Sequence, residues 1–178
     1  MNNVVDVPVD HDARVDVALL RVELQKCLDN KQAVYMVVGI IGSTEEGAVD
    51  EISEILKLRD EFETKGLSFV VHADAAWGGY FASMIRRDIS KQTEKGGPDY
   101  VPHVGLRETT RVQLEHLGEV DSITIDPHKA GYIPYPAGGL CYRDGRQRYL
   151  VTWTAPYINQ STEGESIGIY GVEGRYVI

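Results

Sequence analysis

The feature that most constrains this sequence is a series of short apolar runs separated by longer amphipathic segments. Residues 33–41, AVYMVVGII, form a continuous apolar run rich in β-branched side chains. Such a run is typical of a strand buried on both faces of a parallel sheet. Similar runs at 67–73 and 122–125 predict a second and a third strand. The chain therefore has the elements of a three-stranded sheet.

Amphipathic segments between these runs predict helices over about 16–30, 50–66 and 110–117. Asp16 stands where the first helix needs a cap for its free backbone N–H groups. The order α-β-α-β-α-β indicates right-handed crossover connections. We therefore expect the α/β class, with a mostly parallel sheet and helices on both faces.

Charge and cysteine content exclude several classes of partner. The 178-residue chain carries a formal net charge of −9, which gives no field attracting nucleic acid or an anionic membrane surface. Cys27 and Cys141 are far apart and form neither a zinc ligand set nor a disulfide framework. No apolar run approaches the roughly 18 residues of a membrane helix. We expect a cytoplasmic protein that binds neither nucleic acid nor a membrane.

Reactive side chains follow the end of each predicted strand. Thr44 follows the first strand, Asp74 ends the second, and Asp126, His128 and Lys129 follow the third. The carboxyl ends of parallel strands meet at one edge of a sheet, where ligands bind in open α/β folds. The sequence therefore predicts a site at this edge.

Lys129 is the strongest candidate in that group. A lone lysine is most often a solvated surface residue, but an amine in an α/β crevice can be desolvated and made nucleophilic. The turn residue Pro127 and the glycines Gly131, Gly138 and Gly139, which allow close backbone approach, favour the second interpretation.

A metal site is the alternative. His72 and Asp74 lie two residues apart on one face of a strand, and Asp126 and His128 repeat this spacing. Such pairs suit a metal-dependent hydrolase. This alternative leaves Lys129 and the glycines without a role.

Three motifs carry a resemblance to a known family. HADAAWGGY at 72–80 and SITIDPHKAGYIPYPAGG at 122–139 resemble the pyridoxal-phosphate (PLP)-dependent group II amino-acid decarboxylases. GIIGSTEEGAVD at 39–50 resembles a loop that reaches the cofactor in that family. The likeness is strongest to the tyrosine decarboxylase branch. It implies a fold-type I, transferase-like domain and the conversion of a tyrosine-like L-amino acid to an amine and carbon dioxide.

The resemblance implies the main chemical roles. Lys129 would form the Schiff base with PLP, and Asp74 would hold the pyridine nitrogen protonated so that the ring accepts electrons. Tyr157 would be the tyrosine that returns a proton to the substrate carbon from a mobile loop.

Four further residues receive cofactor-binding roles from the same resemblance. Ala76 would lie against the ring and Thr44 near its substituents. Asp126 and His128 would lie near the phosphate and the lysine.

The resemblance also implies the extent of the chain. Residues 1–178 are expected to be a partial large domain, because the family's phosphate loop and stacking histidine precede the matching part and its small domain follows. The sequence follows the family's pattern up to Gly174 and departs from it over 175–178. The complete enzyme is expected to be a homodimer, and the chain alone is either such a segment or a non-catalytic remnant.

Overall fold

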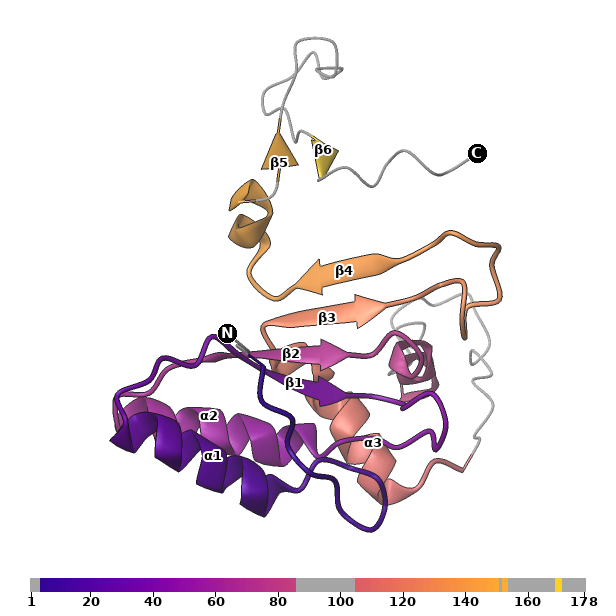
Figure 1. Ribbon diagram of the computed structural model, residues 1–178. Helices are drawn as coiled ribbons and strands as arrows, with labels where there is room; N and C mark the ends of the chain where they lie inside the picture. Colours follow the sequence, from indigo (N-terminus) through magenta and orange to yellow (C-terminus); the bar gives the residue numbers. More distant parts are fainter. Residues whose placement is uncertain (1–3, 86–104, 151, 154–168, 171–178) are drawn as a thin grey trace, which may run out of the picture.

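A four-stranded sheet forms the centre of the computed structural model, which describes residues 4–85, 105–150, 152–153 and 169–170 (Figure 1). Its strands stand in the order β1-β2-β3-β4. The first three are parallel, and the fourth is antiparallel to β3. Their bounds are Met36–Ile40, Val70–Asp74, Ser122–Ile125 and Gly139–Tyr142. A separate two-stranded sheet pairs β5, Thr152–Trp153, with β6, Ile169–Tyr170.

The three predicted strands are confirmed, and β4 is an addition. Its sequence GLCY is short and begins with a glycine, so its pattern alone does not distinguish it from a turn. The pairing with β3 gives it its strand character: Ile125 is opposite Gly139 and Ser122 is opposite Tyr142.

The predicted helices are also present. They are α1, Val17–Asp29, α2, Ile52–Thr64, and α3, Glu108–Glu115, with 3-10 helices η1, η3 and η4 at Gly79–Ile85, His116–Glu119 and Gly145–Leu150. The Asp16 side chain accepts a 3.0 Å hydrogen bond from the Leu19 N–H, which confirms it as the cap of α1.

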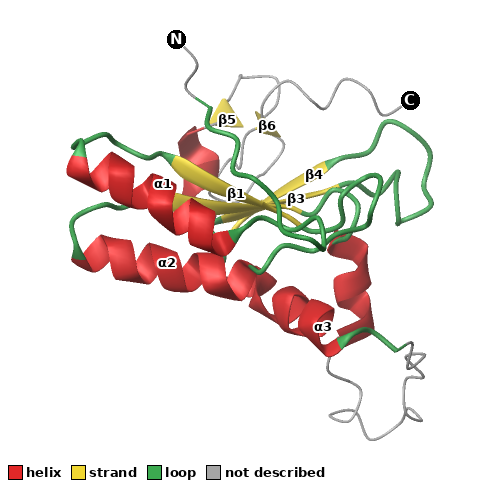
Figure 2. Cartoon of the chain, turned by 60° about the horizontal axis from the view of Figure 1, so that its bottom comes forward, coloured by secondary structure: helices red, strands yellow, loops and turns green. Residues whose placement is uncertain are grey.

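All three α-helices lie on one face of the sheet, as Figure 2 shows. The expectation of helices on both faces is therefore not met within the described ranges. The reason is the strand order: β1, β2 and β3 follow one another in one direction across the sheet. Right-handed crossovers taken in one direction place α2 and α3 on the same side, and α1, which precedes β1, packs into the same core as α2.

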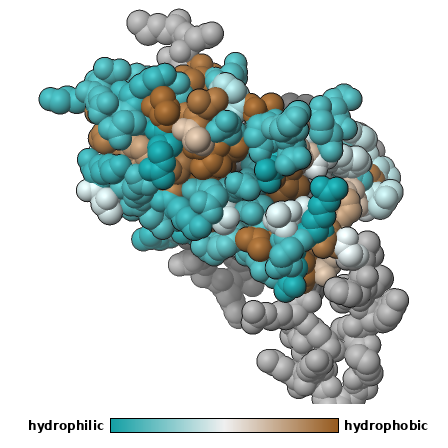
Figure 3. Space-filling model, turned by 90° about the horizontal axis from the view of Figure 1, so that it is seen from below, coloured by the Kyte–Doolittle hydropathy of each residue, from teal (hydrophilic) through white to brown (hydrophobic). Residues whose placement is uncertain are grey.

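The core fills the space between this helix layer and the sheet. Phe62 of α2 and Val71 of β2 are fully buried, and the α1 side chains Leu20 and Leu24 pack into the same cluster. The outer surface of the helix side is mostly hydrophilic, with a smaller hydrophobic patch (Figure 3). No helix within the described parts of the chain is long and apolar enough to cross a membrane.

The opposite face of the sheet is uncovered and partly apolar. Along β1 the side chains alternate, so that Val37 is buried while Met36, Val38 and Ile40 are 43 to 49% exposed. Leu140 of β4 is 53% exposed. The apolar run that predicts a strand buried on both faces is thus buried on one face in this part of the molecule.

Asp50 fixes the carboxyl end of β1 from the helix side. It is only 6% exposed. Its carboxylate accepts hydrogen bonds from the backbone N–H groups of Val15 at 2.7 Å and Ile40 at 2.6 Å. Burial raises the pKa of Asp50, and these two N–H donors partly oppose that rise. The residue joins the segment before α1 to the strand that leads to the site.

Asp50 should give stability an identifiable pH dependence. A pKa raised on folding contributes stability that is fully present below the unfolded-state pKa and is lost as pH rises through the folded-state pKa. We expect the free energy of unfolding of the wild type, relative to Asp50→Asn, to fall as pH rises above about 4, the ordinary pKa of an aspartate. Urea unfolding at several pH values measures this difference.

The control is Asp60→Asn, which removes the same charge from a side chain that is 71% exposed. The difference in the free energy of unfolding between the wild type and Asp60→Asn should not show this fall with rising pH. A wild-type advantage over Asp50→Asn that grows with pH would contradict the prediction.

Candidate active site

The parallel register brings the ends of three strands to one edge of the sheet. Ile40 at the end of β1 pairs with Asp74 at the end of β2, and Asp74 pairs with Thr124 of β3. Figure 1 shows the three arrowheads pointing the same way. The turns after these strands therefore lie beside one another, as the sequence predicts.

Asp74 is held at this edge by its own turn. Its Oδ1 atom accepts a 3.2 Å hydrogen bond from the Ala76 N–H. The Ala76 carbonyl in turn accepts a 3.2 Å bond from the Asp126 N–H, which joins this turn to the one after β3. Among the described residues the Ala76 N–H is the only hydrogen-bond donor to the Asp74 carboxylate. Within the described residues its Oδ2 atom accepts no hydrogen bond.

Lys129 lies in the turn after β3 with its amine against a carboxylate. Its Nζ atom is 3.0 Å from Asp126 Oδ2, and the two side chains are 35% and 16% exposed. The hydrogen bond to Asp126 raises the pKa of Lys129, burial opposes that rise, and charge interactions with Asp126, Asp74 and Tyr135 add to it. The raised pKa keeps the amine in its ammonium form beside the Asp126 carboxylate.

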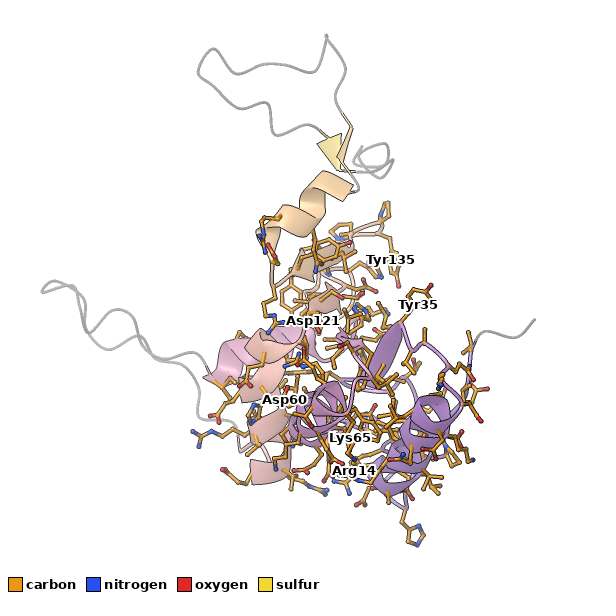
Figure 4. The ribbon with its side chains drawn as sticks, turned by 90° about the vertical axis from the view of Figure 1, so that its left-hand side faces the viewer. Arg14, Tyr35, Asp60, Lys65, Asp121 and Tyr135 are labelled. Atoms are coloured by element: carbon orange, nitrogen blue, oxygen red, sulfur yellow. The ribbon has the colours of Figure 1, made fainter. Side chains whose placement is uncertain are left out.

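His128 is built into the same turn. Its Nδ1 atom lies against the backbone of Ala137, and its Nε2 atom is 3.6 Å from Asp126 Oδ2. The Tyr135 ring lies on the imidazole with 3.8 Å between ring centroids (Tyr135 is labelled in Figure 4). Sequence reasoning missed Tyr135; the signal was the aromatic residue between two prolines in IPYP.

Of the predicted residues that the structure describes, Thr44 is not bonded to this cluster. Thr44 is exposed in the loop after β1, and no hydrogen bond within the described residues joins it to Asp74 or Lys129. The Gly78 N–H donates to the Ile41 carbonyl at 2.8 Å, so this loop is held against the turn after β2. Tyr157 lies outside the described residues.

Two glycines are required by close approach of the chain to itself. A Cβ atom on Gly78 would lie 2.2 Å from the Ile41 carbonyl oxygen, and one on Gly131 would lie 2.5 Å from the Pro127 carbonyl oxygen. The space beside Gly131 is therefore occupied by the turn itself, which corrects the expectation that this glycine makes room for a cofactor.

The histidines and aspartates of the metal alternative do not form one site. His72 Nδ1 is 2.7 Å from Ser122 Oγ, and its Nε2 is 3.1 Å from Thr124 Oγ1. Both ring nitrogens are thus used across the β2–β3 pair. Within the residues that the structure describes, no three His, Cys, Asp or Glu side chains are grouped so that they could hold a metal ion.

Substitution of Gly78 tests whether the turn after Asp74 is seated against β1. Gly78→Ala places a Cβ inside contact distance of backbone atoms, which cannot move as a side-chain end can. We expect a loss of about 1–3 kcal/mol in the free energy of unfolding, measured by urea unfolding.

The matched control is Gly118→Ala, since nothing lies within 4 Å of a Cβ at that position. This variant should unfold within about 0.5 kcal/mol of the wild type. Equal stability of the two variants would mean that the close approach at Gly78 is not maintained.

Comparison with known proteins gives a consistent picture. No family model matches the chain. It is 31% identical to the L-tyrosine decarboxylase of Enterococcus faecium over 192 residues and 35% identical to that of Levilactobacillus brevis over 189 residues. Each alignment covers 98% of this chain, and the chain spans 30% of the length of each relative.

Among solved structures, Oryza sativa TDC with PLP and tryptamine superposes with a TM-score of 0.62 at 22% identity. The match covers 89% of this chain and 27% of that one. At this identity the likeness establishes the fold: the mixed, mostly parallel sheet and its helices are those of a fold-type I domain.

Proposed function

Because the chain belongs, over the segment that it spans, to the tyrosine decarboxylase branch of the PLP-dependent group II amino-acid decarboxylases, we propose that the complete protein decarboxylates a tyrosine-like L-amino acid to its amine. The observation that carries the proposal is the placement of the Lys129 amine and the Asp74 carboxylate at one sheet edge. These are the two groups that PLP chemistry needs from a protein.

The residues present fit this cofactor. The amine of Lys129 is at the edge, 35% exposed, where a ligand can reach it. Asp74 has an oxygen free of other donors in the described residues, so it can accept a hydrogen bond from a protonated ring nitrogen. Ala76 bonds through its backbone to both Asp74 and Asp126, and its short side chain suits the family's role of packing on a flat ring.

Each of these residues would have a distinct task. Bound PLP supplies an electron sink for the bond to the substrate carboxylate. Lys129 anchors the cofactor covalently and gives way to the substrate amine. Asp74 keeps the ring nitrogen protonated through its negative charge. Ala76 packs on the ring.

The remaining assignments complete the proposal. Thr44 would lie near the ring substituents, and His128 with Asp126 near the phosphate. Tyr157 would hold the proton that returns to the substrate carbon. The family resemblance supports these roles.

The same resemblance supports the proposal that residues 1–178 form part of a large cofactor-binding domain. It also supports a homodimeric complete protein. The two thiols, Cys27 and Cys141, are free, which is in keeping with a cytoplasmic protein.

Covalent trapping tests the site directly. The chain is incubated with PLP, reduced with borohydride and digested, and the phosphopyridoxyl group is located by peptide mass spectrometry. We expect the label on Lys129, and its loss in Lys129→Ala. The control Lys65→Ala removes an exposed amine of α2 that is paired with Glu61, and it should keep the label (both Lys65 and Tyr135 are labelled in Figure 4).

Asp74→Asn should weaken PLP binding about tenfold, the effect of losing one charge-assisted hydrogen bond. Absence of label at Lys129 in the wild type would refute the proposed cofactor site. For the complete protein, release of carbon dioxide from carboxyl-labelled L-tyrosine tests the reaction, and no release from any aromatic amino acid would refute it.

A further inference from the structure

The carboxylate nearest to the reactive amine is that of Asp126, and backbone bonds fix it there. The Lys129 N–H donates to the Asp126 carbonyl at 2.9 Å, which closes a tight turn between the two residues. The Asp126 N–H donates to the Ala76 carbonyl at 3.2 Å, which ties that turn to the one after β2. The 3.0 Å contact between Nζ and Oδ2 therefore belongs to a turn that the fold holds in place.

Of the two basic neighbours of Asp126, Lys129 is the one that can move. The His128 ring is 3.6 Å from Asp126 Oδ2 and is restrained by the backbone of Ala137 and by the ring of Tyr135. Lys129 has a flexible four-carbon side chain that is 35% exposed. The carboxylate thus has one fixed neighbour and one that can leave it for a ligand.

Attachment of a cofactor requires that this ion pair separate. An ammonium nitrogen has no free electron pair, so Lys129 must lose a proton before it attacks an aldehyde carbon. A C=N bond then replaces the C=O bond. The aldehyde oxygen leaves as water with the two protons that remain on nitrogen, and the first proton passes to solvent.

We propose that Asp126 is the counter-ion that holds Lys129 as an ammonium ion and so sets the pH at which this amine can bond to the PLP aldehyde. The proposal rests on the proposed function. It gives Asp126 a task distinct from binding the phosphate: it restrains Lys129 while no cofactor is bound, and it receives the amine again when a substrate amine displaces it.

The charged groups around Lys129 determine in which direction its pKa should change when one of them is removed. Asp126 raises the pKa of Lys129 most, while Asp74 and Tyr135 add smaller effects in the same direction and burial acts against them. His128 is the other titratable group beside Asp126. Removing the Asp126 charge therefore lowers the pKa of Lys129 and increases the fraction of free amine near pH 7.

The first experiment uses the cofactor-free chain. Acetylation of Lys129 by trace acetic anhydride is measured from pH 7 to 11 by peptide mass spectrometry. Asp126→Asn should lower the pH at which acetylation of Lys129 is half-maximal by about one unit, and Asp74→Asn should lower it by less. Asp60→Asn, an exposed carboxylate of α2, should leave it unchanged, and Asp126→Glu should restore most of the wild-type value.

The second experiment follows the rate of bond formation with PLP by absorbance, with the product trapped by borohydride. At pH 7 Asp126→Asn should react about tenfold faster than the wild type, because one pH unit is a tenfold change in free amine. Circular dichroism melts verify that each variant is folded, and Asp126→Ser, which also removes the charge, provides the test if Asp126→Asn is not folded.

An unchanged or raised acetylation midpoint in Asp126→Asn would overturn the proposal, as would slower bonding to PLP. Slower bonding would mean that Asp126 assists the attack and does not restrain the amine. If the wild type forms no bond with PLP at Lys129, the proposed function fails and this inference fails with it, even where the acetylation midpoint still shifts.

Discussion

The parallel pairing of β1, β2 and β3 is the constraint on which the rest of the molecule depends. Because the three strands run the same way in a fixed register, every turn that follows them lies at one edge. Asp74 and Lys129 are far apart in sequence and come together for this reason alone. A one-residue slip of β2 would move Asp74 to the helix side and place Val71 on the open face.

Polar bonds on both sides of the sheet hold that register. His72 of β2 spans the hydroxyl groups of Ser122 and Thr124 on β3. Immediately before β3, Asp121 accepts a 2.8 Å bond from the Val71 N–H and pairs with Arg143 (Asp121 is labelled in Figure 4). These buried or half-buried groups are satisfied, so they favour one pairing of strands over its alternatives.

The site combines two opposite electrostatic requirements. A lysine that must attack an aldehyde needs a low pKa, whereas the acidic groups that suit a protonated ring raise the pKa of any neighbouring amine. The Lys129 amine lies 3.0 Å from Asp126 and also interacts with the charge of Asp74, and both carboxylates raise its pKa. In the proposed function, the amine leaves the Asp126 carboxylate to bond to the cofactor, which would reconcile the two requirements.

The sequence by itself determined the helices and the three parallel strands, and the edge of the sheet at which the candidate site lies. The apolar run at 33–41 and the helical stripe from Ile52 to Phe62 predict their elements within a few residues, because burial periodicity is a local property. The motifs around Asp74 and Lys129 predicted the family, which the tyrosine decarboxylase relatives confirm. Only the tertiary structure decided that the helices cover one face of the sheet and that GLCY forms a strand. It also decided two contacts: Asp126 pairs with the Lys129 amine, and His72 bonds to hydroxyl groups of the next strand. Each of these depends on distances between segments remote in sequence, and residue spacing along a chain contains no such distances.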